Sequence, residues 1–406
     1  MKILLVSGYF PPDTGSAANL FYELGRALVR KGHTVTVLTA FPSYHVTGAA
    51  KTYAGSYVDD QIEGMRVHRV RVPQFPRYVP ALRALWQFSM AYCFTRALRR
   101  LDRQEVVLVY SPPLPLGFVG AAAKKRMGAR FVLNVQDLFP RSAIDLGVLR
   151  NRFLVRFFEG LERRIYWSAD HLTVHSQGNK DHVVGVGVPA RAVTVLPNWI
   201  DTEFIRPSGS RHNHFTERYH LNGEFTLSFA GVLGYSQDID VILGAAQRLQ
   251  QGPAVRFLIV GDGVEKERVQ RKAEAMHLDN VTFLPMQPRG VYPLVLHCSD
   301  AGLSTLNREV MSPVVPSKIL SIMAAGKPVL ACMNLEGDAP KIIREAGCGF
   351  VFPAGDDARL AQSIRKLQMS PQLCQMLGEN GRRYCETHFS LTACADRYLE
   401  LFSTLL

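Results

Sequence analysis

Residues 312–331, which read SPVVPSKILSIMAAGKPVLA, constrain the fold more than any other stretch of the sequence. Two prolines among the first five residues exclude a helix there, because proline lacks a backbone N–H and clashes with the preceding turn. Ser317 is a suitable N-cap, and the apolar residues after it recur at helical spacing. Gly326 is expected to end this helix in the left-handed conformation, and a buried strand follows from Val329. The stretch therefore predicts a loop, a short helix and a strand.

The start of this predicted helix has the chemistry of an anion site. A helix N-terminus presents free backbone N–H groups and the positive end of the helix dipole. Pro316, Ser317 and Lys318 lie at this end of the sequence pattern, and the Lys318 ammonium adds a full positive charge. Ser321 follows one turn later. We therefore expect this end of the helix to bind a diphosphate group.

The rest of the chain repeats the order of strand, loop and helix in both halves. Short apolar runs typical of parallel strands, such as 2–7 and 131–135, alternate with amphipathic stretches such as 153–167. No hairpin signal interrupts this order, and residues 53–60 have the composition of an irregular, exposed loop. At 406 residues, the chain is long enough for two doubly wound α/β domains that face a cleft.

The net positive charge of the chain is confined to its first half. Residues 1–200 contain 26 lysines and arginines against 13 acidic residues, and the remainder contains 47 − 26 = 21 against 35 − 13 = 22. This asymmetry predicts an anionic partner for the first half alone. Seven scattered cysteines without a CxxC pair favour reduced thiols over a disulfide frame or a zinc site.

The N-terminus reads as a first strand, MKILLVSGYF, rather than as a signal peptide. No apolar run reaches the roughly 18 residues that a membrane-spanning helix needs. The dispersed histidines and cysteines form no metal-binding pattern. We therefore expect a cytoplasmic protein without a bound metal.

Residues 66–103 contain nine arginines, one acidic residue and six aromatic residues. Two interpretations of this stretch stay open. It forms either a core helix with a solvated basic face, or a peripheral contact with an anionic membrane or acceptor. The residues of such a contact would be Arg77, Arg83, Trp86 and Arg96. No signature of a nucleic-acid-binding module accompanies them, so nucleic acid is not expected as a partner.

The loop after the first strand, GYFPPDTGSAANL, invites comparison with dinucleotide-binding folds. Its glycines, Gly8 and Gly15, do not have the G-x-G-x-x-G spacing that a nicotinamide dinucleotide requires. The sequence therefore disfavours a nicotinamide-dependent enzyme.

Several motifs, in the order in which they occur, resemble the retaining family 4 glycosyltransferases of the GT-B architecture. They are the N-terminal FPPDTGS and GHTVTVLT segments, VLPNWID at 195–201 and AAGKPV at 324–329. The resemblance covers almost the whole chain. It implies two Rossmann-like domains, 1–200 for the acceptor and 201–385 for the nucleotide-sugar, and a C-terminal helix within 386–406 that crosses back to the first domain.

The resemblance also places residues around a UDP-, GDP- or dTDP-sugar donor. Gly15 and Ser16 would lie beside the donor phosphates and the acceptor. Gly231 would let the backbone approach a phosphate closely, because glycine has no side chain in the way. Met286 would lie at the pocket for the base.

The chain departs from the family pattern at several charged positions. The usual arginine and lysine of the glycine loop fall on Val232 and Gln237, and the usual pair of glutamates falls on Pro313 and Ser321. Nucleotide recognition is therefore expected to differ in detail, with Lys318 carrying much of the charge on the diphosphate. No metal ion or other cofactor is implied, since helix N-termini and Lys318 would stabilise the leaving group.

Residues 136–147, QDLFPRSAIDLG, resemble a subgroup that makes bacterial surface polysaccharides and is close to the fucosamine transferases. Gln136 and Asp137 follow a buried strand, where open α/β sheets keep their chemistry. Both are catalytic candidates. Asp137 would hold sugar hydroxyls or stabilise positive charge as the glycosidic bond breaks. The alternative is that Asp137 only caps a helix.

These features and the resemblance together predict a retaining glycosyltransferase that acts on a lipid-linked or other anionic acceptor. It would be either free in the cytoplasm or peripheral at the inner face of the cell membrane. Three alternatives remain. The first is a nucleotide-sugar epimerase or phosphorylase on the same fold. The second is a transferase for a natural product or another soluble acceptor. The third is a non-catalytic nucleotide-sugar binder, since the missing charged residues could mark an inactive site.

Overall fold

The computed structural model describes residues 1–13, 16–42, 55–73, 75, 80–145, 147–221, 223–310 and 315–406. The chain divides into two compact units. The first unit joins Met1–Asn198 to Leu391–Leu406, and the second unit is Trp199–Ser390. The limits predicted from the sequence were 200/201 and 385/386. The C-terminal segment that belongs to the first unit thus begins at Leu391, later than expected.

The first unit contains an eight-stranded sheet in the order β3-β4-β2-β1-β5-β6-β7-β8. The strands are β1 (Lys2–Val6), β2 (Thr34–Ala40), β3 (Tyr57–Ile62), β4 (Met65–Val70), β5 (Val106–Ser111), β6 (Arg130–Val135), β7 (His171–Val174) and β8 (Val193–Val195). The helices are α1 (Ser16–Arg30), α2 (Pro80–Ala97), α3 (Gly117–Met127), α4 (Arg141–Asp145), α5 (Arg152–Ser168), α6 (Gln177–Gly185) and α15 (Leu391–Leu405), with short 3-10 turns η1 (Leu98–Arg100), η2 (Leu114–Leu116) and η3 (Ala190–Ala192).

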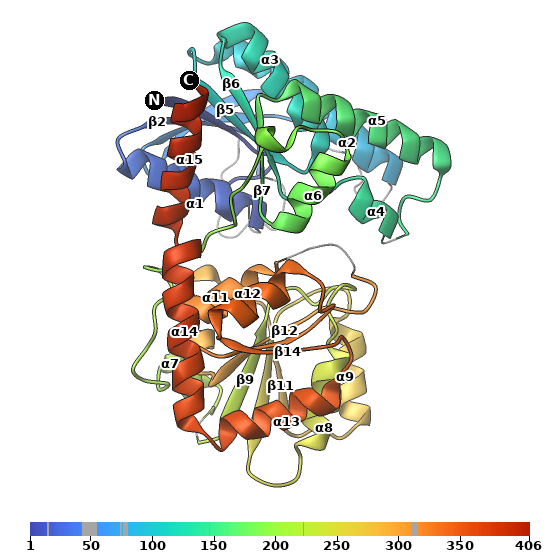
Figure 1. Ribbon diagram of the computed structural model, residues 1–406, viewed down its shortest axis with the longest axis vertical. Helices are drawn as coiled ribbons and strands as arrows, with labels where there is room; N and C mark the ends of the chain where they lie inside the picture. Colours follow the sequence, from blue (N-terminus) through green and yellow to red (C-terminus); the bar gives the residue numbers. More distant parts are fainter. Residues whose placement is uncertain are drawn as a thin grey trace. The chain divides into compact units, whose positions relative to one another are not determined.

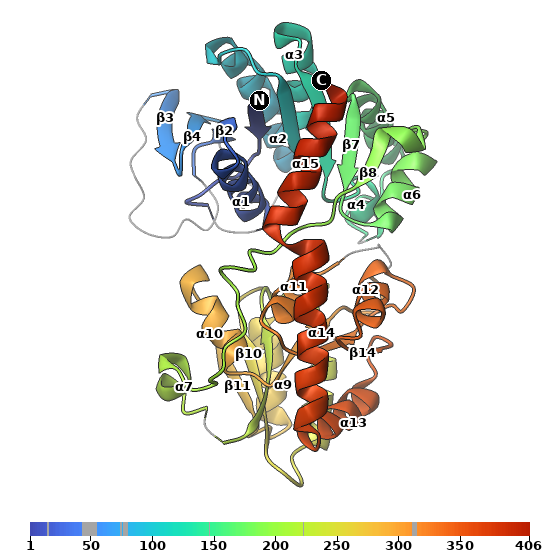
Figure 2. The same ribbon diagram turned by 60° about the vertical axis from the view of Figure 1, so that its left-hand side comes forward.

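Helices cover both faces of this sheet (Figures 1 and 2). α1 packs against α15, and α3 packs against both α2 and α5. The central strands are almost wholly apolar because parallel strands covered on both faces lose contact with water on both sides. All six residues of β5, for example, are buried.

A hairpin of β3 and β4 forms one edge of the first sheet, where the sequence analysis expected an irregular loop. β3 runs antiparallel to β4, and Ile62 pairs with Met65. The two loop residues, Glu63 and Gly64, have φ angles of 50° and 80°. Such a left-handed two-residue loop matches the twist of the strands that it joins. The sequence did not predict this hairpin, because its Glu–Gly loop differs from the usual Asn–Gly or Asp–Gly signal.

The second unit contains a six-stranded sheet in the order β11-β10-β9-β12-β13-β14, in which all neighbouring strands are parallel. The strands are β9 (Phe225–Ala230), β10 (Val255–Val260), β11 (Val281–Leu284), β12 (Ala301–Thr305), β13 (Val329–Cys332) and β14 (Gly349–Phe352). The helices are α7 (His214–Arg218), α8 (Asp240–Arg248), α9 (Lys266–Ala275), α10 (Tyr292–His297), α11 (Ser317–Ala324), α12 (Asp338–Ala346), α13 (Asp357–Gln368) and α14 (Pro371–Phe389), with a 3-10 turn η4 (Arg289–Val291).

Each sheet reverses its winding direction at one point. In the first unit this switch lies between β1 and β5, and in the second unit it lies between β9 and β12. The prediction of two doubly wound α/β domains is therefore confirmed. In sheets of this kind, ligands bind outside the carboxyl ends of the strands at the switch. None of the helices in the described part of the chain is both long enough and apolar enough to span a bilayer.

Candidate active site

Lys318 lies at the switch point of the second unit. It is the second residue of α11, which follows the loop after β12. Its ammonium Nζ lies 3.8 Å from the centroid of the Phe229 ring of β9. Nζ also donates a hydrogen bond of 2.6 Å to Oε1 of Gln237. Two predicted donor-binding residues from distant parts of the sequence, Lys318 and Gln237, thus meet at the place where such sheets bind ligands.

The environment of Lys318 favours an anionic ligand. Burial lowers the pKa of its ammonium to about 7, because the protein replaces only part of the lost hydration. The Phe229 ring and the Gln237 carbonyl attract the charged form, but both are neutral groups. Among the residues that the structure describes, no carboxylate pairs with Lys318. A bound phosphate would supply the missing negative charge.

The glycine loop after β9 packs backbone against backbone with the loop after β10. Gly231 has a φ of 149°, a conformation that side chains disfavour. A Cβ atom at Gly261 would lie 1.9 Å from the carbonyl oxygen of Gly231, and one at Gly263 would lie 2.4 Å from that of Leu233. Both positions thus require glycine. Gly231 was predicted, whereas Gly261 and Gly263 were missed as site residues although they directly follow a strand end.

Asp137 lies two residues beyond the carboxyl end of β6 in the first unit, and it is exposed. Burial raises the pKa values of the Tyr110 and Tyr166 hydroxyls, and the negative charge of Asp137 raises both pKa values further. Asp137 therefore lies near both rings. Within the described residues, its carboxylate makes no hydrogen bond or ion pair. α4 begins at Arg141, so Asp137 is too far upstream to be its N-cap. The helix-cap alternative is therefore wrong.

Two family models match the chain in the order of its two units. A model described as "Glycosyl transferase 4-like domain" matches residues 15–199, and a model described as "Glycosyl transferases group 1" matches residues 211–384. Together they account for most of both units. The chain belongs to the family 4 glycosyltransferases.

This glycosyltransferase is similar to two bacterial proteins that are also named as glycosyltransferases. It is 25% identical over 333 residues to the putative colanic acid biosynthesis glycosyl transferase WcaI of Escherichia coli strain K12, a match that covers 80% of this chain and 82% of WcaI. It is 29% identical over 287 residues to the probable glycosyltransferase WbjE of Pseudomonas aeruginosa, a match that covers 70% of this chain and 72% of WbjE.

Solved structures place the glycosyltransferase in the GT-B fold. Sucrose-phosphate synthase from Thermosynechococcus elongatus superposes with a TM-score of 0.77 at 17% identity, covering 99% of this chain and 98% of that one. Anabaena HepE in complex with UDP-glucose superposes with a TM-score of 0.72 at 18% identity, covering 100% of both chains. The predicted GT-B architecture is therefore confirmed.

Asn307 is a site residue of the glycosyltransferase that the sequence analysis missed. It follows β12, and its backbone N–H donates a hydrogen bond of 3.0 Å to the Ser236 carbonyl. Its side-chain amide donates to the Tyr235 carbonyl. Asn307 thus fastens the glycine loop to the neighbouring strand end. The available signal was its position after a buried strand, which is the same signal that pointed to Asp137.

The remaining predicted donor residues differ in exposure and in their place in the helix. Val232 follows β9 and Met286 follows β11, and their exposed fractions are 63% and 47%. Ser317 is the first residue of α11 rather than its N-cap, which is Pro316 and makes no side-chain capping bond. The first turn of α11 therefore has no capping side chain.

Ser321, another predicted donor-binding residue, is buried. It is 5% exposed. Its hydroxyl donates a hydrogen bond of 3.3 Å to the Ser317 carbonyl. This contact lies within α11, so the side chain stabilises the first turns of that helix.

Both polar atoms of the Gln136 side chain are hydrogen-bonded within the first unit. Its Nε2 donates a hydrogen bond of 2.9 Å to Asn134 Oδ1, and its Oε1 accepts one of 2.7 Å from Asn198 Nδ2. Asn134 Nδ2 in turn donates a hydrogen bond of 3.0 Å to the buried Tyr398 hydroxyl of α15. Gln136 is thus a positioning residue that joins β6 to the segment leading out of the first unit.

The two predicted membrane residues whose side chains are described, Trp86 and Arg96, differ in exposure. Trp86 of α2 is only 4% exposed and belongs to the hydrophobic core, so it cannot lie at a lipid boundary in this fold. Arg96 is exposed, and its guanidinium contacts the Tyr92 side chain. Gly15 and Arg77 lie outside the described residues, as do the side chains of Ser16, the first residue of α1, and Arg83 of α2.

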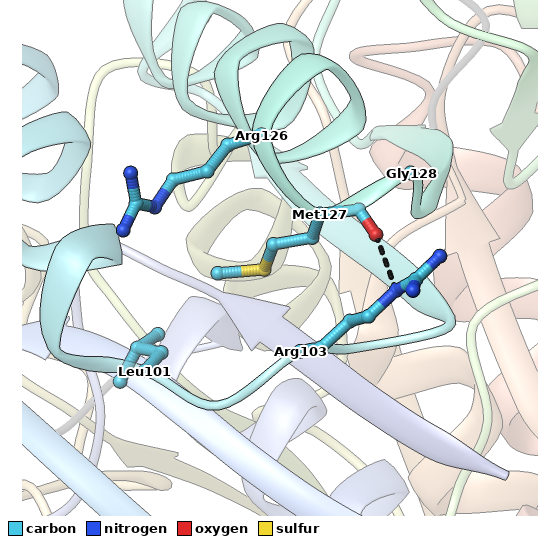
Figure 3. Close-up of a pocket in the computed structure, with 5 residues that line it drawn as sticks. All are labelled: Leu101, Arg103, Arg126, Met127 and Gly128. Atoms are coloured by element: carbon cyan, nitrogen blue, oxygen red, sulfur yellow. Dashed lines mark hydrogen bonds between the residues drawn. The ribbon is translucent and has the colours of Figure 1, made fainter.

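A cavity of about 510 Å³ lies at the other end of the first sheet. Its lining residues are Leu101, Arg103, Arg126, Met127 and Gly128. Arg103 donates a hydrogen bond of 2.9 Å to the Met127 carbonyl, as Figure 3 shows. These residues precede β5 and β6, whereas Asp137 follows β6. The cavity is therefore at the amino ends of the strands, away from the catalytic candidate.

Proposed function

We propose that this chain is a retaining glycosyltransferase that moves a sugar from a nucleoside diphosphate donor to an acceptor in the synthesis of a bacterial surface polysaccharide or glycolipid. Lys318 carries the proposal, because its ammonium lies at the switch point of the second sheet and pairs with no carboxylate in the described part of the chain. The relative WcaI, whose name assigns it to colanic acid biosynthesis, supports the biosynthetic setting. So does the O-antigen chain mannosyltransferase C of Escherichia coli, which is 22% identical over 409 residues.

The second unit supplies the groups that stabilise the leaving diphosphate. When the bond between the anomeric carbon and the phosphate oxygen breaks, the electron pair stays on the phosphate. Lys318, the backbone N–H groups at the start of α11 and the glycine loop at Gly231 can stabilise this negative charge. We propose that these groups act without a metal ion or another cofactor.

The first unit supplies Asp137 and a positively charged surface. The exposed Asp137 carboxylate is available to hold sugar hydroxyls or to stabilise positive charge at the anomeric carbon. The excess of 26 cationic over 13 acidic residues in residues 1–200 favours an anionic acceptor, such as a lipid-linked phosphate. A fucosamine-like sugar remains part of the proposal, since the QDLFPRSAIDLG segment resembles that subgroup.

A screen of nucleotides tests the proposed function. Thermal shift with UDP, GDP, dTDP and ADP identifies the base, and the matching nucleotide-sugars are then incubated with the protein in the presence of EDTA. Release of nucleoside diphosphate with retention at the anomeric carbon supports the proposal. Epimerised donor without transfer would instead identify an epimerase, and binding without any turnover would identify a nucleotide-sugar binder.

Replacing Lys318 by alanine is expected to weaken binding of the nucleoside diphosphate by about 1.5–3 kcal/mol, the range for a hydrogen bond to a charged group. The reason is that Lys318 is the cation at the switch point, in contact with Phe229 and Gln237. Isothermal titration calorimetry measures the effect. Lys341→Ala, which removes an exposed lysine of the same unit, is the control. An unchanged Kd for Lys318→Ala would contradict the assignment.

Donor binding is expected to weaken as pH rises above 7. The pKa of Lys318 is about 7 in the free protein, so half of the ammonium is already neutral there. A bound diphosphate favours the charged form and raises this pKa, so binding takes up a proton and the affinity falls by up to about tenfold per pH unit. Titrations of the nucleotide-sugar between pH 6.5 and 9, in buffers that differ in ionisation enthalpy, measure this uptake. Lys318→Ala should abolish the slope, and a slope that persists in this variant would refute the explanation.

A further inference from the structure

α5 is buried along one face and exposed along the other. Its buried residues include Phe158, Leu161 and Ile165, which join the core of the first unit. Asn151 caps the N-terminus of the helix, accepting hydrogen bonds from the backbone N–H groups of residues 153 and 154. The fold therefore fixes which face of α5 points outward. This helix runs along the surface of the first unit in both views (Figures 1 and 2).

The outward face of α5 carries a row of large aromatic side chains. Phe153, Phe157 and Trp167 have exposed fractions of 75%, 55% and 60%. Their spacing of four and ten residues puts them along one side of a helix, with Gly160 and Arg164 between them. Leu154, at 50% exposure, lies beside this row on the same helix. Elsewhere among the described residues of the first unit, the large apolar side chains at 50% exposure or more are Leu85 and Tyr92 of α2, Val148 and Leu406. In this described part, α5 therefore carries the largest group of exposed apolar side chains.

A row of arginines runs beside the aromatic row. Arg152, Arg156 and Arg163 are exposed at helical spacing, and Arg164 lies within the aromatic row itself. Within the described residues, none of these four guanidinium groups has an ion-pair partner. Glu159 is the one exposed carboxylate of α5, since Glu162 is 3% exposed and lies against His182. The outward face thus keeps a net positive charge.

We propose that the outward face of α5 is the surface by which this protein attaches to an anionic lipid bilayer. Aromatic side chains suit the boundary between headgroups and acyl chains, and unpaired arginines complement lipid phosphates. The proposal rests on the lipid-linked acceptor of the proposed function, since attachment there brings the first unit to its acceptor. We prefer α5 to α2, the helix of the membrane interpretation of residues 66–103, because Trp86 of α2 is buried and only Leu85 and Tyr92 among its described large apolar side chains are at least 50% exposed.

Co-sedimentation of the full-length chain with lipid vesicles tests the surface. Wild-type protein should bind vesicles of phosphatidylcholine mixed with phosphatidylglycerol, and part of it should dissociate from them at high salt. It should not bind vesicles of pure phosphatidylcholine. Replacing Arg152, Arg156 and Arg163 by glutamate should weaken partitioning about a hundredfold or more, since each basic residue near an anionic bilayer contributes about fivefold. Failure of the wild-type protein to bind at low salt would overturn the proposal.

The matched control is a triple variant of equal charge change elsewhere in the first unit. Lys125, Arg126 and Arg191 are exposed cations outside α5. Their replacement by glutamate should affect partitioning much less, because none of the three is on the outward face of α5 and solvent and salt screen charges that stay in solution. Equal loss in the control would show that net charge alone drives binding, and would overturn the proposal. Unchanged melting temperature and nucleotide binding verify that each variant is folded and that the donor site is intact.

The native tryptophans give a second readout. Trp86 and Trp199 are each 4% exposed, whereas Trp167 is 60% exposed at the end of the aromatic row. Vesicles with brominated acyl chains should therefore quench mainly Trp167, and Trp167→Phe should lose this quenching while it still sediments. Phe153→Ser combined with Phe157→Ser should weaken binding by about tenfold per phenylalanine, an effect that salt does not remove.

Two results would assign the face differently and overturn the proposal. One is loss of vesicle binding in Arg96→Glu of α2 while the α5 variants bind normally. The other is a dimer in sedimentation velocity that the phenylalanine variants dissociate, which would mean that a second copy covers α5. If vesicle binding fails but donor turnover on a soluble acceptor persists, only this inference fails and the proposed function stands.

Discussion

Replacing Asp137 by asparagine is expected to lower kcat about 100- to 1,000-fold, the range for loss of one preorganised electrostatic group in a catalytic site. Asparagine keeps the size of the side chain but removes its charge. Asp137 is exposed and, in the described part of the chain, makes no hydrogen bond or ion pair, so the melting temperature should hardly change. Steady-state kinetics with the identified nucleotide-sugar and thermal unfolding measure the two effects.

Asp181→Asn is the matched control, because Asp181 is also an exposed carboxylate of the first unit. It should leave kcat unchanged. Gln136→Ala should behave differently from Asp137→Asn, since it breaks the hydrogen bonds to Asn134 and Asn198 and so lowers the melting temperature. Normal specific activity of soluble Asp137→Asn, combined with a large loss of stability, would assign Asp137 a structural role.

Replacing Asp60 by alanine is expected to lower the free energy of unfolding of the first unit by about 3–5 kcal/mol. This is the usual cost of removing one partner of a buried ion pair, because the other charge stays buried without compensation. Arg69 is 1% exposed, and its Nε lies 2.7 Å from Asp60 Oδ2. The same guanidinium donates to the Pro11 carbonyl at 2.5 Å. It thus ties the β3–β4 hairpin to the loop after β1.

Asp102→Ala is the matched control for Asp60→Ala. Asp102 pairs with Arg66, which is on the same strand as Arg69, at 2.9 Å, but the two side chains are 72% and 62% exposed. Such exposed pairs contribute about 0–1 kcal/mol. Urea unfolding of both variants, followed by tryptophan fluorescence, gives the comparison. Equal losses in the two variants would show that burial of Arg69 does not set the cost.

The sequence by itself determined the order of the elements and the chemistry at their ends. Gly326 follows α11 with a φ of 67°, as expected of a glycine that ends a helix. Lys318 lies in the first turn of α11, and Asp137 follows β6. These features depend on local periodicity and on backbone conformations that only certain residues adopt, so they can be inferred from neighbouring residues in the chain.

Only the tertiary structure decided which of these residues meet and which faces are buried. Lys318 contacts Gln237 because β9 lies beside β12, an order that no local pattern encodes. Gln136 and Asp137 are neighbours in sequence, yet the amide is used by Asn198 and the carboxylate is exposed. Likewise Trp86 is in the core and Trp167 is on the surface. The physical reason is that burial depends on what packs against a side chain, and those partners come from distant parts of the chain.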